Sequence, residues 1–505
     1  MSKQLGSKRS PKSAKTAGSA RRPASREVAG SEVRGGARVQ MSRLKNGMRV
    51  LIAERHLDPV VAVMVFYRVG ARNETEREAG VSHFLEHMMF KGTRRLAKGE
   101  VDRLTTELGG QNNAFTGNDH TGYWFEFASD RWERALKIEA ERMKNLRLDP
   151  LEFEAERQVV LEELAMGEDD PWRVLARRVE AIVFQRHPYG RPIIGFADTV
   201  RGVSLEQMRS HYRRFYHPGN ATLVIAGDVV PAKALAAARR AFGPLAAGPA
   251  YAEVDPPRAP IEEPAGEMRL EVRWPDQGRR LCVAWPTVAV GTRDDYALDL
   301  VATILTSGRN SRLQRRLVLD GALAVHVSAS NDTRVEGGAF WLFAECSQGT
   351  APEALESAVD DELARIAREP VSTQELERAL ALIRSGEAHD AETVTDLAEE
   401  LGGFAVDIDW RLAFDGAREH AKLTPADLSE TVARLLARGR RVVGWCLPRP
   451  GSEAVAEDDD GDEGFDTEPD GEPETAASPA GAFARAAESN SDVSAHSTAP
   501  TGGMR

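Results

Sequence analysis

Residues 80–93 read Gly80-Val81-Ser82-His83-Phe84-Leu85-Glu86-His87-Met88-Met89-Phe90-Lys91-Gly92-Thr93, and this stretch decides how the rest of the chain is interpreted. We expect a helix over residues 80–89. Residues four apart on a helix lie on one face about one turn apart, so His83 and His87 can reach a single metal ion. Glu86 lies beside the same face and can hold a water without being a ligand itself. The pattern reverses the H-E-x-x-H zinc motif, although alone it would also fit a pair of capping or core histidines.

A second helix, expected over residues 150–166, offers the carboxylate that such a site still needs. Glu156 and Glu163 share one of its faces, because seven residues make nearly two turns. A catalytic zinc site needs three protein ligands and one open position, and two His with one Glu is a common hydrolase set. Glu163 is therefore the predicted third ligand, whereas Glu162 points about 100° away, toward solvent. Glu156 is predicted to lie next to the site and to orient a ligand or share the proton work.

These stretches resemble the pitrilysin and mitochondrial-processing-peptidase-like zinc peptidases, whose H-x-x-E-H signature defines inverzincins. The resemblance covers about residues 41–450. The motifs that carry it are Gly70-Ala71-Arg72-Asn73-Glu74, residues 80–93, Glu156-Arg157 through Glu162-Glu163-Leu164, Asp169-Asp170-Pro171, His187-Pro188-Tyr189-Gly190, and Tyr216-His217-Pro218 through Gly227-Asp228.

The resemblance implies a zinc-dependent endopeptidase that hydrolyses extended or unfolded peptides. In such an enzyme His83, His87 and Glu163 bind one Zn²⁺ per chain. Glu86 is the general base that takes a proton from the activated water and delivers it to the leaving amine, and Glu156 assists.

Residues 109–116, Gly109-Gly110-Gln111-Asn112-Asn113-Ala114-Phe115-Thr116, look like the family's edge strand, to which a substrate peptide adds as a further strand. The resemblance makes Asn113 and Ala114 backbone-binding positions. The alternative is an ordinary Gly/Asn turn before a strand.

Members of this family also supply an Arg and a Tyr that grip the substrate from the second half of the catalytic chamber. The matching positions here are Val318 and Val325, and neither side chain can donate a hydrogen bond. Arg315 or Arg316 could replace the Arg, but no residue replaces the Tyr. Some relatives divide the work between two chains, so we expect this chain to be the zinc-bearing subunit. Its partner would be a second homologous subunit that carries the Arg/Tyr pair, with a homodimer as the alternative.

Apolar periodicity and turn residues predict two successive blocks in which strands and helices follow in a similar order, which suggests an internal duplication. The expected fold is α+β: two tandem homologous domains, each a mostly antiparallel sheet packed with helices, forming half of a clam-shaped peptidase chamber. The predicted limits are 1–38 for a disordered basic arm, 39–247 for the catalytic zinc-binding domain, 248–266 for a linker, 267–450 for a peptidase-like domain without a zinc motif, and 451–505 for a disordered acidic tail.

Composition excludes several classes of protein. The net charge of −12 gives no general reason to expect nucleic-acid binding. The strongest apolar run, residues 60–67, is far shorter than the roughly 20 residues that span a bilayer, so no membrane association is expected. Three widely spaced cysteines argue against a disulfide scaffold or a Cys-rich zinc module. No apolar stretch typical of a secretion signal is seen, which favours the cytoplasm, with an organelle matrix as the alternative.

Two other functions remain open at this point. One is a non-catalytic assembly or scaffold subunit of a peptidase-like complex, which would have no reason to keep a complete metal-and-base set. The other is a binding protein that works through its charged ends: residues 1–38 carry ten Lys or Arg and two Glu, and residues 451–505 carry fourteen Asp or Glu and two Arg. Outside the motif, His187 and His217 are interpreted as structural, His120 has no fixed role, and Arg157 is expected to be a structural ion-pair partner.

Overall fold

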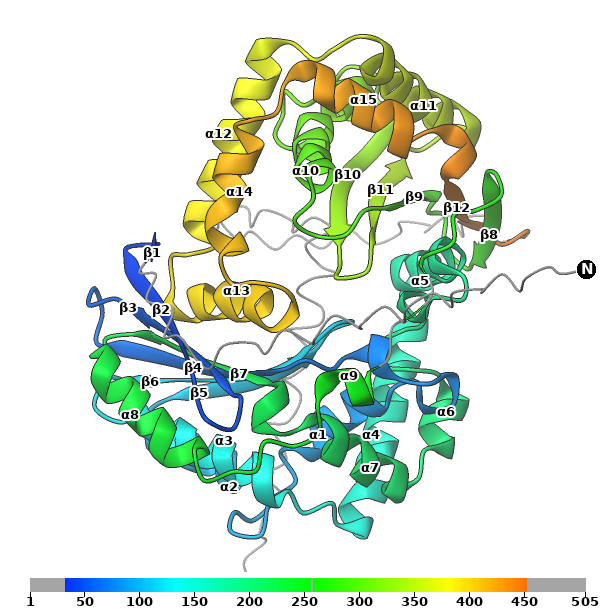
Figure 1. Cartoon of the computed structure of the whole chain (residues 1–505). Coiled ribbons are helices and arrows are strands. Elements are labelled where there is room, and N and C mark those ends of the chain that lie inside the picture. The colour runs from blue at the N-terminus through cyan, green and yellow to red at the C-terminus, as the bar shows by residue number, and fades with distance from the viewer. Residues whose placement is uncertain (1–31, 256–257, 259, 452–505) are drawn as a thin grey trace, which may run out of the picture.

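The computed structural model describes residues 32–255, 258 and 260–451 of the 505-residue chain. Residues 452–505 of the predicted tail and residues 1–31 of the predicted arm lie outside the described residues. Two sheets, each covered by helices on both faces, form two lobes (Figure 1). We call the part built on the seven-stranded sheet the first lobe and the part built on the five-stranded sheet the second lobe.

The sheets are built from twelve strands in the described part of the chain. In the first lobe the spatial order is β1-β2-β3-β7-β4-β6-β5, and in the second it is β10-β11-β9-β12-β8. The bounds are β1 Glu32–Arg34, β2 Ala37–Arg43, β3 Arg49–Glu54, β4 Val60–Tyr67, β5 Gln111–Thr116, β6 Thr121–Ala128, β7 Ala221–Gly227, β8 Met268–Trp274, β9 Arg280–Thr287, β10 Ala324–Thr333, β11 Gly338–Cys346 and β12 Val442–Pro448.

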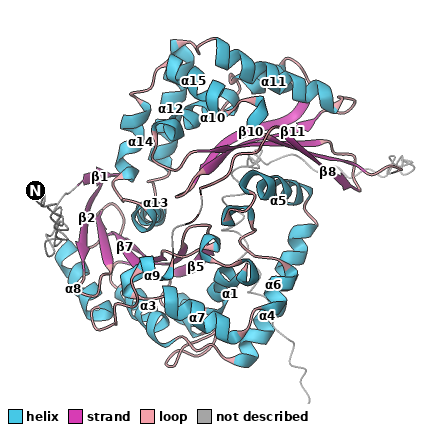
Figure 2. Cartoon of the chain, turned by 45° about the vertical axis from the view of Figure 1, so that its right-hand side comes forward, coloured by secondary structure: helices cyan, strands magenta, loops and turns pink. Residues whose placement is uncertain are grey.

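Helices cover both sheets, as the view coloured by secondary structure shows (Figure 2). The α-helix bounds are α1 Val81–Met88, α2 Glu100–Glu107, α3 Glu133–Asn145, α4 Pro150–Glu168, α5 Pro171–Phe184, α6 Ala197–Gly202, α7 Leu205–Phe215, α8 Pro231–Phe242, α9 Tyr251–Val254, α10 Arg293–Thr306, α11 Pro352–Arg368, α12 Thr373–His389, α13 Val394–Asp407, α14 Leu412–His420 and α15 Pro425–Leu435. A π-helical turn at Gln314–Leu319 precedes β10.

The two sheets share one topology. The order β3-β7-β4-β6-β5 in the first lobe corresponds strand for strand to β8-β12-β9-β11-β10 in the second. The pairs β3–β7 and β8–β12 are parallel, and the other pairs are antiparallel. The expected α+β fold of two tandem, mostly antiparallel sheets packed with helices is therefore confirmed. The shared strand order supports the internal duplication that the sequence pattern suggested.

Each lobe is completed by a helix from the other half of the chain. Strand β4 is almost wholly buried, because its alternate residues point to opposite faces of the sheet and both faces are covered by helices. Val61, Val63 and Val65 pack in the core beneath the helices of the first lobe, whereas Met64 and Phe66 pack with α13. Helix α13 follows the second lobe's α12 in the chain, yet it lies on the sheet of the first lobe (Figure 1).

The exchange is reciprocal, because α5 of the first half covers the second sheet. Its Leu175 and Val179 join a core with residues of β9, β11 and β12, and the opposite face of that sheet packs on α10, α11 and α15. Arg49 and Arg55 hold α13 on the first sheet. Arg49 donates to two carbonyls at the end of α13, and Arg55 to two carbonyls just before its start.

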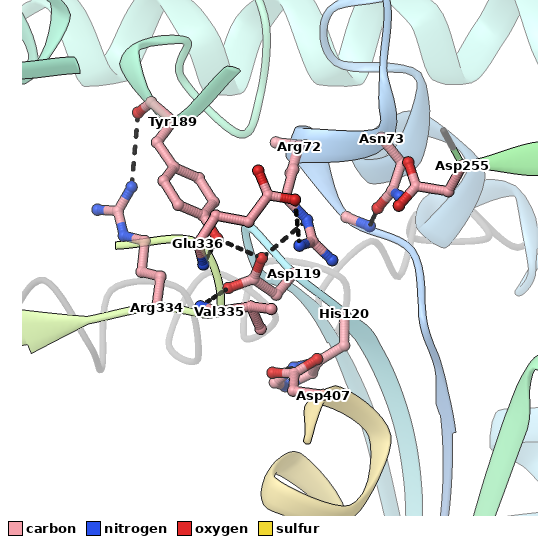
Figure 3. A network of polar contacts seen from close by, with 12 residues as sticks. Arg72, Asn73, Asp119, His120, Tyr189, Asp255, Arg334, Val335, Glu336 and Asp407 are labelled. Carbon is pink, nitrogen blue, oxygen red and sulfur yellow. Dashed lines mark hydrogen bonds and ion pairs between the residues drawn. The ribbon is translucent and has the colours of Figure 1, made fainter. Parts of the chain in front are cut away.

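The turn between β10 and β11 is bound to the first lobe through buried polar contacts (Figure 3). Arg72 pairs with Asp119 and with Glu336 of that turn, at 2.9 Å in each case. Tyr189 donates to Asp119 at 2.6 Å and accepts from the backbone N–H of Glu336 at 3.2 Å. The backbone N–H of Val335 also donates to Asp119. Together with the exchanged helices, these bonds fix the two lobes relative to each other.

One predicted limit needs correction. The basic arm was expected to reach residue 38, but β1 pairs with β2, whose Ala37 and Val39 are fully buried under α13. A basic composition did not reveal this pairing, which needs a distant helix to bury the apolar residues. The expected linker 248–266 contains the short helix α9, and its residues 256, 257 and 259 lie outside the described part. No helix among the described residues is long and apolar enough to cross a membrane.

Gly402 of α13 allows the close approach of that helix to the first sheet. A Cβ there would meet a ring carbon of Phe66 at 2.0 Å, whereas at the neighbouring Gly403 the nearest atom is a carbon of His120 at 3.7 Å. We expect Gly402→Ala to lower the free energy of unfolding by about 1–3 kcal/mol through overpacking. Gly403→Ala should be neutral or stabilising by up to about 1 kcal/mol, because Ala favours helix more than Gly. Denaturant titration measures both; equal destabilisation would contradict the packing.

Candidate metal centre

Helix α1 begins in a turn that a buried carboxylate organises. Gly80 has a φ of 96°, which favours glycine, and a Cβ there would meet the carbonyl oxygen of Ile194 at 2.4 Å. Glu74 accepts hydrogen bonds from the backbone N–H groups of Gly80 and Ser82, which satisfies donors at the helix start. Burial raises the pKa of Glu74 to about 7 despite these bonds.

The buried face of α1 sets the direction of its polar face. Phe84, Leu85 and Met88 are buried in the first-lobe core, so His83, Glu86 and His87, which lie on the opposite side of the helix, face away from it. The predicted helix over residues 80–89 is thus confirmed to within one residue at each end.

Helix α4 packs directly against α1. Asp149 caps its start by accepting from the backbone N–H groups of residues 151 and 152, with Pro150 as the first helical residue. Phe153 stacks on Phe84 with 4.8 Å between ring centroids and 15° between planes. The guanidinium of Arg157 lies over both rings and is paired with Glu154, so Arg157 has the structural role that was expected.

This packing brings the predicted ligands together. The Nε2 of His83 lies 3.6 Å from one oxygen of Glu163, and the Nε2 of His87 lies 3.5 Å from the other. One ligand atom from each residue falls within 4.8 Å of the others, and no other such group of three metal-ligating side chains occurs in the described residues. Glu162 is exposed, as expected from its position on α4.

The arrangement fits a zinc ion. Two donors that share a tetrahedral zinc with bonds near 2.0–2.1 Å stand about 3.4 Å apart, close to the two distances between His nitrogen and Glu163 oxygen. Burial lowers the pKa of His83 to about 4, so this imidazole is neutral and has a lone pair for a metal at pH 7. Burial also acts on His87, but hydrogen bonds with Glu156 and Glu163 outweigh it and raise the pKa of His87 to about 9. Metal binding would therefore displace a proton from His87.

Glu156 contacts the Nδ1 side of the His87 ring and is itself paired with a lysine. One oxygen of Glu156 lies 2.9 Å from Nδ1 of His87, and the other lies 2.6 Å from Nζ of Lys91. Burial opposes ionisation, but the bonds with His87 and Lys91 keep the pKa of Glu156 below its usual value. A carboxylate on the far nitrogen of a metal-binding His fixes the ring and its tautomer. Sequence reasoning missed Lys91, although its position four residues after His87, in the turn that follows α1, is a signal for such a contact.

Glu86 is partly buried beside the three ligand residues. Its Oε2 accepts a hydrogen bond from Oγ1 of Thr116, the last residue of β5. Burial raises the pKa of Glu86 to about 7, although the Thr116 bond and the charge of His87 act in the opposite direction. A carboxyl group with a pKa near neutrality is suited to take up and release a proton.

Asn113 and Ala114 lie in the middle of β5. Among the described strands this one pairs with β6 alone, so it forms the edge of the first sheet, next to α1. The carbonyl oxygen of the Asn113 side chain accepts from the backbone N–H of Ala114. The alternative of a simple turn before a strand is wrong for these two residues, because both belong to the strand.

The positions matched to the family's Arg and Tyr lie in the second lobe. Val318 belongs to the π-helical turn and is partly buried, whereas Val325 in β10 is 61% exposed. Arg315 pairs with Asp320 on the surface. Arg316 pairs with carboxylates of α11. Both candidate replacements for the Arg are therefore engaged within the second lobe.

His187, His217 and His120, the histidines outside the motif that the sequence analysis considered, lie in structural contacts. His187 pairs with Glu336 at 2.8 Å and belongs to the contacts between the lobes. His217 bonds to the backbone carbonyl of Arg214 at 3.0 Å. His120, for which the sequence indicated no role, pairs with Asp407 at the end of α13.

Comparison with known proteins places the chain in a family. Residues 49–196 match the family described as insulinase, peptidase family M16, and residues 202–383 match the domain described as peptidase M16 inactive domain. The chain belongs to this insulinase family, so the resemblance to pitrilysin-like peptidases is confirmed. The family and the names of the relatives support a zinc-type peptidase.

Named relatives span most of the chain. An uncharacterised zinc protease of Rickettsia felis is 30% identical over 72% of this chain and 86% of its own length. The zinc protease PqqE of Helicobacter pylori is 28% identical over 76% of this chain and 87% of its own. The crystal structure of a protease from Helicobacter pylori matches with a TM-score of 0.78 at 26% identity, covering 82% of this chain and all of that one.

Metal analysis tests the ligand set. We expect the purified chain to bind about one zinc, and His87→Ala and Glu163→Ala to bind less than about a tenth of that, since each removes one of three protein ligands. Glu86→Gln should keep the metal, because Glu86 is not a ligand. Elemental analysis after dialysis measures the zinc per chain. A full complement of zinc in Glu163→Ala would contradict the assignment.

Glu156→Gln tests the support behind His87. We expect zinc affinity to fall about 10–100-fold, because the variant replaces the carboxylate that orients the ring. Competition with a chromophoric chelator measures the affinity. Glu154→Gln is the matched control, because that exposed residue lies on the same helix and contacts Arg157 instead. Equal affinities of Glu156→Gln and the unmodified protein would contradict this role.

Proposed function

We propose that this chain is a zinc-dependent endopeptidase that hydrolyses peptide bonds in extended or unfolded peptides, with one zinc held by His83, His87 and Glu163. The observation that carries the proposal is the convergence of three ligand side chains and one further carboxylate, Glu86, from two packed helices. Membership of the insulinase family and relatives named zinc proteases support it.

The chain's own residues supply binding and proton transfer. A bound zinc would lower the pKa of a water toward 7 and polarise a substrate carbonyl. Glu86, whose pKa is about 7, takes the water proton on its carboxylate and returns it to the leaving amine. Glu156 assists by holding the His87 ring through Nδ1. An extended peptide pairs with the open edge of β5, where Asn113 and Ala114 bind its backbone.

We also propose that the active assembly contains a second homologous subunit, which supplies the Arg and Tyr that this chain lacks. Support comes from Val318 and Val325 at the matched positions and from the ion pairs that engage Arg315 and Arg316. The two lobes of one chain would then be half of a clam-shaped chamber. A homodimer is the alternative assembly, and the cytoplasm is the proposed location.

A non-catalytic assembly subunit of a peptidase-like complex is the alternative function. Only the lack of a matched Arg and Tyr favours it. The set of Glu86, Glu156 and the three ligand residues argues against it, because a scaffold has no use for a buried carboxylate beside a metal site.

Cleavage of a quenched fluorescent peptide by the purified chain, alone and together with a homologous Arg/Tyr-bearing chain, tests the function. We expect turnover by the two chains together that a zinc chelator abolishes and added zinc restores. Glu86→Gln should lower kcat at least about 100-fold while zinc remains bound, because Gln cannot accept the proton. Glu162→Gln is the matched control, since this exposed residue lies beside Glu163 and faces solvent.

The outcome separates the candidate functions. Turnover by the chain alone supports an enzyme that works as a monomer or homodimer and overturns the need for a different subunit. Turnover that appears only after a homologous Arg/Tyr-bearing chain is added supports the two-subunit proposal. Full turnover in Glu86→Gln would overturn the role of Glu86 as general base.

A further inference from the structure

Thr116 links the edge strand β5 to the carboxylate of Glu86. Its Oγ1 donates a hydrogen bond to Oε2 of Glu86, although the two residues lie thirty positions apart in the chain. The Thr116 side chain is 4% exposed, and its backbone is paired with Thr121 of β6. The donor therefore has a fixed position, set by the sheet rather than by α1.

This bond makes the two oxygens of Glu86 unequal. Oε2 is engaged by Thr116, whereas Oε1 accepts no hydrogen bond from the part of the chain that the structure describes. The last torsion of a Glu side chain is broad and roughly two-fold, so an unsupported carboxylate rotates between orientations. A donor on one oxygen selects one orientation and leaves the other oxygen for a water.

We propose, on the basis of the function proposed above, that Thr116 is a positioning residue that orients the Glu86 carboxylate for proton transfer. Strand β5 then has two tasks. Its residues 113 and 114 bind the peptide backbone, and two residues further on Thr116 holds the general base. One short strand sets both the register of the substrate and the direction of the group that moves the proton.

The variant Thr116→Val tests this role, because Val keeps the branched shape and strand preference of Thr but loses the hydroxyl donor. We expect kcat to fall roughly 10–100-fold, the range expected for a hydrogen bond to a charged group, with KM changed less than about two-fold. Thr116→Ser keeps the hydroxyl and should restore kcat to within about three-fold of the unmodified protein. Zinc content should equal that of the unmodified protein in both variants.

Thr121→Val is the matched control. Thr121 is the cross-strand partner of Thr116 and is fully buried, but its hydroxyl donates to the carbonyl of Val69 and not to Glu86. We expect its kcat to stay within about two-fold. Equal losses of kcat in Thr116→Val and Thr121→Val, or no loss in Thr116→Val, would overturn the positioning role.

Crystal structures of the zinc-loaded variants give a readout that does not depend on turnover. We expect the Glu86 carboxylate to keep one orientation in Thr116→Ser and to be rotated or divided between orientations in Thr116→Val. If no peptide is cleaved by the unmodified protein, either alone or together with a homologous Arg/Tyr-bearing chain, the proposed function fails, and this comparison still decides the role of Thr116. A Glu86 carboxylate unchanged in Thr116→Val would overturn the proposal.

Discussion

The packing of α1 against α4 is the constraint on which the candidate site depends. A spacing of four residues places the imidazoles of His83 and His87 on one helical face, but the third predicted ligand is on another helix. The stacked rings of Phe84 and Phe153, with the Arg157 guanidinium over both, fix the distance and rotation between the helices. Glu163 then falls 3.5–3.6 Å from both imidazole nitrogens. An apolar contact thus determines a polar geometry, in which the three predicted ligand side chains come within 4.8 Å of one another.

The same principle operates on the scale of the lobes. Both sheets bury two faces, so each needs helices on two sides, and each takes one of them from the other half of the chain. The exchange of α5 and α13, together with the contacts of Arg72 and Glu336, joins the lobes into one body.

Much of the fold could be predicted from local pattern. The sequence pattern predicts a strand over residues 338–346 and a helix over residues 352–368, and these are the bounds of β11 and α11. The predicted bounds of α1 and α4 differ from the observed ones by only one or two residues. The α+β class and the tandem arrangement were also predicted correctly. Helix α13 and strand β1 were not predicted. Their burial depends on residues in distant parts of the chain, and local composition does not show which residues pack against them.

The candidate site divides in the same way. Its ligand residues follow from helical spacing and a motif, and the structure brings these side chains together. Lys91 could have been found from its spacing to His87, whereas the bond between Thr116 and Glu86 depends on how β5 lies beside α1.

We propose above all that His83, His87 and Glu163 share one zinc ion. A crystal structure with anomalous diffraction data at the zinc absorption edge tests this proposal most directly. We expect one peak per chain within bonding distance of all three side chains; no peak there, or a peak held by other residues, would contradict the proposal.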